Sequence, residues 1–295
     1  MALRLFCRWT SRRTICLFLL LCTVHLTGAL PPATGQNGRA GTIEPAPDYE
    51  AALTRLLQQV VTEEGRVRYD LLQNSLRPDF RRVLKAVEDF DATTLRTHEQ
   101  KLAFWMNAYN VQMLQNIIET PQVQHIIDDG FADAFFDTPF RTARTRITLN
   151  EIENVILRME DGQAELMSFR VDRLDPRIHV GLNCAAVSCP RLRNRAFTAD
   201  NVDTELDAAM RDFAGSPAHL RVEGSRVILS SLLDWYGSDF DEAGLPAGEF
   251  LLRYMPETRP DYDALKQALG GRRADAIKAR PNVRFDYAWE VNRAQ

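Results

Sequence analysis

Residues 177–190 gather the kinds of side chain that proteins use for catalysis, metal binding and covalent cross-linking. They read R-I-H-V-G-L-N-C-A-A-V-S-C-P, which places His179, Asn183, Cys184 and Cys189 close together in the sequence. A thiol beside an imidazole can act as a nucleophile with its base. Two thiols separated by a short turn can instead close a disulfide.

The catalytic hypothesis pairs His179 with Cys184 or Cys189 in a cysteine-dependent hydrolase or transferase. The order of histidine before cysteine suits a circularly permuted papain-like enzyme, in which an asparagine orients the imidazole. We expect a strand over 177–183, because Asp175-Pro176 cannot continue a helix. Side chains alternate between the faces of a strand, so Cys184 would point away from His179 unless the strand ends before it.

The second hypothesis is a disulfide between Cys184 and Cys189, which would fix the loop after the predicted strand. Closing so short a loop stabilises the fold by only about 2 kcal/mol. We predict neither a metal site nor a cofactor. Structural zinc takes four ligands, usually from two close pairs, and no second close pair of cysteines or histidines follows residue 29.

The segment Glu99–Glu119 predicts a long helix that is central to the core. Its apolar residues recur at helical spacing: Leu102, Trp105, Met106, Tyr109, Met113 and Ile117.

Asn107 and Asn110 are neighbours on the surface of that helix. A buried amide must be hydrogen-bonded, so one interpretation is that the two asparagines tie neighbouring loops to the helix. The other interpretation is that they and Tyr109 line a ligand pocket together with His179 and Asn183.

A second helix is predicted over Asn150–Met159, with Ile152, Val155 and Ile156 facing inward. Asn150 and Glu153 have the spacing of an N-cap and its reciprocal partner. Glu153 is therefore expected as a cap or ion-pair residue, with a role as general acid as the alternative.

The remaining periodic segments complete the predicted fold. Further helices are expected over 48–60, 200–213, 247–254 and 261–279, and strands or hairpins over 140–149, 219–229 and 283–287. Helices outnumber strands, and the two do not alternate regularly. The sequence therefore predicts an α+β fold: a mainly helical single domain with a small, partly antiparallel sheet.

The first 29 residues differ from the rest and are typical of an export signal. Four arginines and no acidic residue precede an apolar run of 15 residues from Ile15 to Ala29. We expect a signal peptide over 1–29, cleaved near Ala29, and a periplasmic or secreted protein. The run is shorter than the roughly 20 residues of a membrane span, so membrane contact is expected only through an uncleaved leader.

The rest of the chain divides simply. Residues 30–47 are rich in proline and glycine and predict a flexible spacer, followed by one domain over 48–295. Removing the leader leaves 32 of the 36 basic residues against all 40 acidic ones, a net charge of −8. An acidic exported domain is a poor candidate for nucleic-acid binding, which needs a basic surface.

Several motifs resemble one protein family. They are K-L-A-F-W-M-N-A-Y-N (101–110), N-E-I-E-N-V-I-L-R (150–158), D-P-R-I-H-V-G-L-N-C-A-A-V-S-C-P (175–190), L-S-S-L-L-D-W-Y-G-S-D-F (229–240) and F-D-Y-A-W-E-V-N (285–292). Together they are similar to the domain-of-unknown-function 547 family of bacteria and plants, over about 66–292. Asn154 departs from the histidine expected there. The resemblance implies an architecture and transfers no reaction.

Two function hypotheses follow. The first is an exported binding protein for a small ligand or an envelope protein, with Asn107, Tyr109, Asn110, Glu153 and Asn183 as candidate ligand residues. The second is the thiol enzyme that uses His179 with Cys184 or Cys189.

Overall fold

The structure is a computed structural model that describes residues 48–128 and 130–294. The predicted signal peptide (1–29) and spacer (30–47) lie outside the described residues. As the sequence predicts, the fold is a mainly helical α+β domain. The longer helices are α1 (Tyr49–Val60), α3 (Arg77–Asp89), α4 (His98–Glu119), α9 (Val202–Gly215), α12 (Ala247–Tyr254) and α13 (Tyr262–Leu269).

Shorter helices connect these elements. They are α2 (Tyr69–Gln73), α5 (Phe131–Asp137), α6 (Leu149–Glu151), α7 (Ala164–Met167), α8 (Ile178–Gly181), α10 (Leu232–Trp235), α11 (Gly237–Asp241) and α14 (Ala274–Lys278). A π-helical turn, Ile152–Leu157, continues α6.

Helix α4 is the central element of the larger of two apolar clusters, as its stripe predicts. It begins at a capping box, in which the Thr97 side chain accepts from Gln100 N–H and the Gln100 side chain accepts from Thr97 N–H. Most of its residues are buried, on every face. A helix that is surrounded in this way belongs to the core, so α4 is a fixed support for the loops packed on it.

Two small sheets account for the strands. A hairpin joins β1 (Phe140–Thr142) and β2 (Thr145–Ile147) through Ala143 and Arg144, which both have positive φ. The turn tolerates this conformation because the N–H groups of both residues donate to carbonyls at the end of α3. The second sheet has the order β3–β4–β5: β3 (Leu220–Glu223) pairs antiparallel with β4 (Arg226–Ser230), and β5 (Val283–Asp286) pairs parallel with β4.

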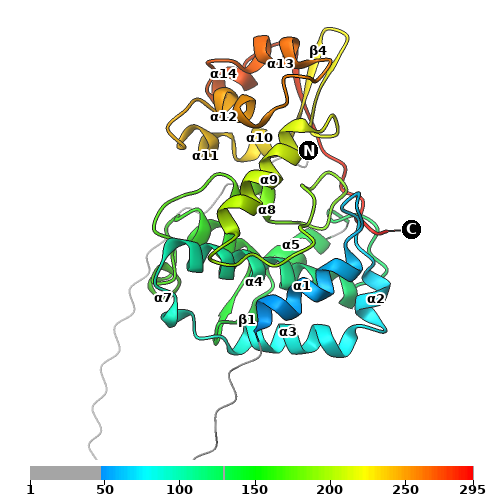
Figure 1. Ribbon diagram of the computed structural model, residues 1–295, viewed down its shortest axis with the longest axis vertical. Coiled ribbons are helices and arrows are strands. Elements are labelled where there is room, and N and C mark those ends of the chain that lie inside the picture. The colour runs from blue at the N-terminus through cyan, green and yellow to red at the C-terminus, as the bar shows by residue number, and fades with distance from the viewer. Residues whose placement is uncertain (1–47, 129, 295) are drawn as a thin grey trace, which may run out of the picture. The chain divides into compact units, whose positions relative to one another are not determined.

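The second apolar cluster packs α9 and this sheet against α10–α14. Figure 1 shows α12, α13, α14 and β4 grouped at one end of the described fold, with α1–α3 at the other and α8 and α9 between them. Helix α8 contributes to both clusters, since Ile178 packs in the first and Val180 in the second. His179 therefore lies where the two clusters meet.

The strand predicted over 177–183 is wrong. Residues Ile178–Gly181 form the short helix α8 instead, and all four are buried. Asp175 starts the turn, because its carboxylate accepts the Arg177 N–H and its carbonyl accepts the Ile178 N–H. A short buried apolar run has no periodicity that separates strand from helix, which explains the error.

Two helix boundaries also differ from prediction. The N-cap of α6 is Thr148, whose partner is Glu151, so Asn150 and Glu153 are not the predicted capping pair. The segment 261–279 is two helices, α13 and α14, separated at Gly270-Gly271, where Gly271 has φ of +69°.

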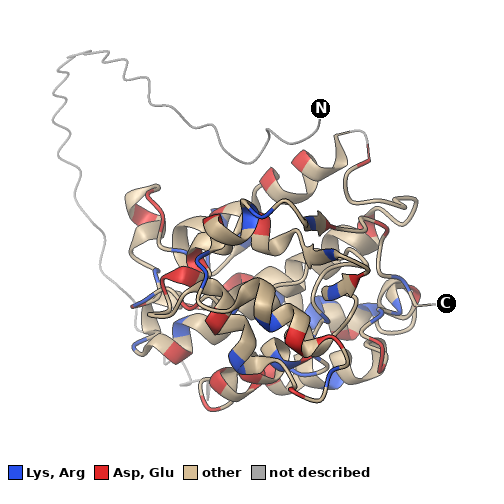
Figure 2. Cartoon of the chain, turned by 90° about the horizontal axis from the view of Figure 1, so that it is seen from above, with Lys and Arg blue, Asp and Glu red and all other residues tan. Residues whose placement is uncertain are grey.

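Charged groups are interspersed over the described helices and loops, without a continuous basic stripe in view (Figure 2). Among residues 48–128 and 130–294, no helix combines the length and apolar character that crossing a bilayer requires.

Candidate functional site

The π-helical turn Ile152–Leu157 places a buried carboxylate at the centre of the candidate site. Thr148 and Glu151 cap the preceding helix, and the wider turn that follows carries Glu153, which is 7% exposed. Single π-turns within helices are rare and are frequent at functional sites. A buried carboxylate is costly unless neighbouring groups compensate its charge. The neighbours of Glu153 therefore indicate its role.

His179 is an ionisable neighbour of Glu153 and is held in one orientation. Its Nε2–H donates to Asp239 at 2.8 Å, while its Nδ1 lies 3.8 Å from a Glu153 oxygen and has no hydrogen-bond partner within the described residues. The ring stacks on Tyr236 at 4.0 Å. The imidazole is thus fixed, with one buried nitrogen directed toward the carboxylate.

Arg158 keeps the carboxylate behind His179 charged. Its Nε and Nη2 donate to the two oxygens of Asp239 at 2.6 and 3.1 Å. Burial alone would raise the pKa of Asp239, but the hydrogen bonds from His179 and Arg158 hold it well below its usual range. An ionised Asp239 accepts the hydrogen bond from His179 Nε2, which fixes the orientation of the imidazole ring.

The two cysteines lie face to face on the loop after α8. Their sulfurs are 2.7 Å apart, both thiols are free, and Cys184 N–H donates to Cys189 Sγ at 2.8 Å. Cys184 Sγ is also 3.0 Å from the Tyr287 hydroxyl. The hydrogen bond with Cys189 lowers the pKa of the Cys184 thiol, whereas burial raises the pKa of Cys189.

Amide side chains hold this loop in place. Asn183 accepts from Ala185 N–H and donates to the Pro190 carbonyl, and Ala185 adopts φ of +62° between the two cysteines. Asn110 of α4 accepts from Asn183 N–H and donates to the Gly181 carbonyl. A buried non-glycine residue at positive φ persists only where its surroundings hold it, so the loop is rigidly positioned.

The other α4 candidates divide between structural and electrostatic roles. Asn107 accepts from Phe197 N–H and donates to the Phe197 carbonyl, so its amide ties the segment before α9 to α4. Tyr109 is buried, and burial, followed by the charge of Glu153, raises the pKa of its hydroxyl. Asn107 and Asn110 therefore make the backbone bonds that one interpretation of the sequence predicts.

A cluster of partly exposed aromatic rings flanks the thiols. Trp235 and Trp289 stack with centroids 5.5 Å apart, and Tyr287 lies 4.9 Å from the first and 4.6 Å from the second. Sequence reasoning did not assign a site role to Asp239, Tyr236 or Tyr287. All three lie in the motifs 229–240 and 285–292. The polar and aromatic residues of those motifs, which a core alone does not need, could have indicated a site role.

The predicted pairing of His179 with a thiol stays a prediction. The ring of His179 contacts Asp239, Glu153 and Tyr236, and the contacts of Cys184 are with Cys189 and Tyr287. Glu153 lies beside His179, and after burial its charge also raises the pKa of the Tyr236 hydroxyl. No group of three or more histidine, cysteine or acidic side chains among the described residues is arranged to hold a metal ion.

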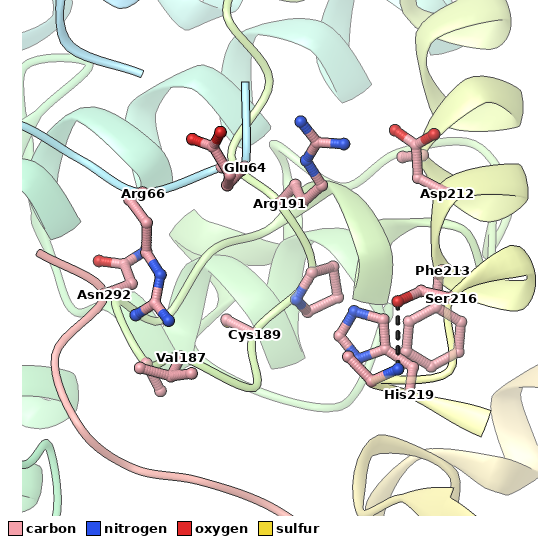
Figure 3. A pocket seen from close by; sticks show the side chains of 15 residues that line it. Glu64, Arg66, Val187, Cys189, Arg191, Asp212, Phe213, Ser216, His219 and Asn292 are labelled. Atoms are coloured by element: carbon pink, nitrogen blue, oxygen red, sulfur yellow. Dashed lines mark hydrogen bonds between the residues drawn. The ribbon is translucent and has the colours of Figure 1, made fainter. Parts of the chain in front are cut away.

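The loop that carries Cys189 also lines a cavity of about 260 Å³ (Figure 3). Four segments line it: the turn after α1, the loop that carries Cys189, the end of α9 with the residues that follow, and the C-terminal segment at Asn292. The lining includes Glu64, Gly65, Arg66, Val187, Cys189, Pro190, Arg191, Asp212, Phe213, Ser216, His219 and Asn292.

The cavity combines cationic groups with one neutral imidazole. Arg66 and Arg191 make no ion pair with any described residue, whereas Asp212 pairs with Arg193 at 2.8 Å. Burial lowers the pKa of His219 to about 4, so the ring is neutral at pH 7. Its Nδ1 is buried and has no hydrogen-bond partner among residues 48–128 and 130–294, and its ring stacks on Phe213.

Gly65 is required where Arg191 crosses the cavity wall. It has φ of +78°, and a Cβ there would come within 2.7 Å of Arg191 Cγ. The glycine lets the aliphatic stem of Arg191 lie against the backbone.

Comparison with known proteins gives one result. Residues 93–214, which include α4, the π-turn, the thiol loop and α9, match the model of a family described as "Protein of unknown function, DUF547". No curated protein and no solved structure matches the chain.

Proposed function

The chain carries a DUF547 domain over residues 93–214, and we propose a function for it from the geometry, because the family's description gives no activity. The protein binds a small organic anion in the cavity that Cys189 and His219 line. The observation that carries this proposal is the pair of arginines, Arg66 and Arg191, which line the cavity without an ion-pair partner in the part of the chain that the structure describes. Small-ligand sites are concave, with a few convergent polar groups on an otherwise apolar lining. A cavity of 260 Å³ is just below the range for drug-sized ligands, so the ligand is small.

The charge of the cavity favours an anion. The whole chain has a net charge of −4, yet here two arginines face one carboxylate, Glu64, that is not engaged in an ion pair with a described residue. Guanidinium groups bind carboxylates through charge-assisted hydrogen bonds. The proposed ligand therefore places its carboxylate against Arg66 or Arg191.

The uncharged part of the cavity lining indicates what kind of group the ligand carries besides its carboxylate. Phe213, Pro190 and Val187 offer apolar contact, and the neutral His219 ring offers a hydrogen-bonding atom beside them. A monocarboxylate with a compact apolar body matches this division. The same arrangement favours a small ligand over an envelope protein as the partner.

The test compares benzoate with benzamide, which has the same shape without the charge, and adds acetate and butanoate as smaller carboxylates. Nuclear magnetic resonance titration of the full chain is expected to give a dissociation constant for at least one carboxylate and shifts at Val187 and the His219 ring. Arg66→Gln and Arg191→Gln should each weaken that binding about tenfold, because each removes one charge-assisted interaction.

Arg226→Gln is the matched control, since Arg226 is exposed on β4 and does not line the cavity. It should bind as the wild type does. Equal binding of benzamide and benzoate would overturn the anion proposal. So would undiminished affinity in both cavity variants, or no binding of any of the three carboxylates.

We further propose that the protein acts after export, with its leader removed near Ala29. The two cysteines of the described fold would then meet an oxidising compartment, in which a disulfide between Cys184 and Cys189 persists. The closeness of their sulfurs supports that part of the proposal.

A further inference from the structure

We infer that Cys184 and Cys189 form a thiol–disulfide exchange site, in which Cys184 attacks a disulfide of a partner and Cys189 resolves the mixed disulfide. This activity goes beyond ligand binding in the cavity and does not depend on it. It rests on the position of the two sulfurs, their unequal exposure and the aromatic rings beside them.

The pair is arranged to switch between thiol and disulfide forms with little movement. The sulfurs are 2.7 Å apart, and a disulfide bond is about 2.05 Å long. Asn183 bonds to both sides of the loop, and Asn292 N–H donates to the Ala185 carbonyl between the cysteines. Because the backbone is held in this way, either form fits the same loop conformation.

The two sulfurs differ in the manner that exchange requires. Cys184 is partly exposed, whereas Cys189 is buried. The thiolate is the attacking species, and the hydrogen bond with Cys189 lowers the pKa of Cys184, with a further contribution from Tyr287. A partly exposed cysteine with a thiol of lowered pKa, beside a buried second cysteine, is the arrangement that attack on an external disulfide requires.

The exchange balances in atoms and electrons. The Cys184 thiolate attacks one sulfur of the partner disulfide, a new S–S bond forms, and the other partner sulfur leaves as a thiolate that takes up a proton. Cys189 then loses its proton and attacks Cys184 Sγ, which releases the second partner thiol. The partner disulfide is reduced by two electrons, and the Cys184–Cys189 dithiol is oxidised to a disulfide; the reverse sequence reoxidises a dithiol partner.

The surface around Cys184 suits a disulfide that is carried on a peptide. Tyr287 contacts the sulfur directly, and Trp235 and Trp289 pack on Tyr287. Sulfur atoms make favourable contacts with aromatic rings, and partly exposed aromatic side chains supply large contact areas. These rings would lie against the residues that flank the partner's disulfide.

The experiment uses the full chain, reduced beforehand, with insulin as a protein disulfide and glutathione disulfide as a small one. The wild type is expected to reduce insulin and to end as the Cys184–Cys189 disulfide. Cys189→Ser should accumulate a mixed disulfide, which peptide mapping assigns to Cys184 rather than to the cysteines before residue 30. Cys184→Ser should react at least about tenfold more slowly with both disulfides.

Tyr287→Phe keeps the ring and removes only the hydroxyl beside Cys184. It is expected to shift the pH profile of Cys184 alkylation to higher pH, a change that a purely structural tyrosine would not cause. Faster reaction of insulin than of glutathione disulfide would identify a peptide partner, and the opposite order a small-molecule one.

Two results would overturn the inference. One is a wild-type reaction rate in Cys184→Ser, with both serine variants folded by circular dichroism. The other, which needs no variant, is a wild-type disulfide that stays closed in excess reduced glutathione, because such a bond is a structural staple.

Discussion

At the scale of single residues, His219 shows how burial sets chemistry. The ring is 7% exposed and stacked on Phe213, and burial is the cause that lowers its pKa to about 4 from a reference value near 6.5. Between pH 6.5 and 4 the unfolded chain binds a proton at this residue and the folded chain does not. Stability therefore decreases as the pH falls through that window.

We predict that His219→Gln removes part of this pH dependence. In the wild type, the depressed pKa of His219 should lower the free energy of unfolding by roughly 2 to 3 kcal/mol as the pH falls from 7 to 4.5. Urea unfolding at both pH values measures it, with His125→Gln, an exposed histidine, as the control. An equal pH dependence in the wild type and His219→Gln would contradict the prediction.

The asparagines of α4 make a second point at the residue scale. Their spacing showed that they share a helix surface, and either a structural or a ligand-binding role fitted that fact. The structure shows Asn107 bonded to Phe197 and Asn110 to the loop that leads to Cys184. Only the position of those partner loops, far along the chain, distinguishes the two roles.

At the scale of elements, Asp239 joins three pieces of structure. It lies on α11 and accepts hydrogen bonds from His179 of α8 and from Arg158 at the end of the π-turn. All three side chains are mostly buried. Removing the Asp239 carboxylate would leave the mostly buried guanidinium of Arg158 without its main partner. Leaving a buried charge unpaired is among the more costly changes in a protein interior.

Asp239→Ala is accordingly predicted to lower the free energy of unfolding by about 3 to 5 kcal/mol at pH 7. Because the pKa of Asp239 is depressed in the fold, its contribution is complete above the unfolded value near 4 and is lost as the pH falls below it. The cost of the substitution should shrink between pH 4 and pH 2. Denaturant unfolding of Asp239→Ala at each pH measures both effects. Asp263→Ala is the control, because Asp263 is an exposed aspartate of α13. A cost of Asp239→Ala that did not change with pH would refute the link between the Asp239 pKa and stability.

The helices themselves were predictable to different degrees. Helix α4 was predicted within one residue because its apolar stripe is long, and the two hairpins because their turns are short. Helix α3 was missed, although Phe80, Val83 and Val87 are buried at helical spacing, since charged residues occupy most of its other positions. The sequence predicts a strand where the structure has helix α8, because four buried residues carry no periodic signal.

At the scale of the whole molecule, two apolar clusters meet at α8, and the chemistry lies along that junction. Glu153 and Cys184 come from the side of the first cluster, Asp239 from the side of the second, and His179 from α8 between them. The cavity lies by the same junction and is lined by the start and the end of the described chain as well as its middle.

Export is the proposal that concerns the whole chain. If the leader is removed as proposed, protein recovered from its native cells should begin at or near Leu30 and should not react with iodoacetamide until reduced. Intact-mass measurement before and after reduction checks both statements. A chain that keeps Met1 and carries free thiols would count against both export and the resting disulfide.

The sequence by itself determined the helical class of the fold, the rigid central helix and the residue types of the thiol loop, because these follow from local spacing. Tertiary structure alone decided the partners: Asp239 for His179, Tyr287 for Cys184, and Arg66 with His219 for the cavity beside Cys189. Each of these pairs joins residues far apart in the chain. Their meeting depends on how two apolar clusters bury their surfaces against one another, and no local pattern of residues records that.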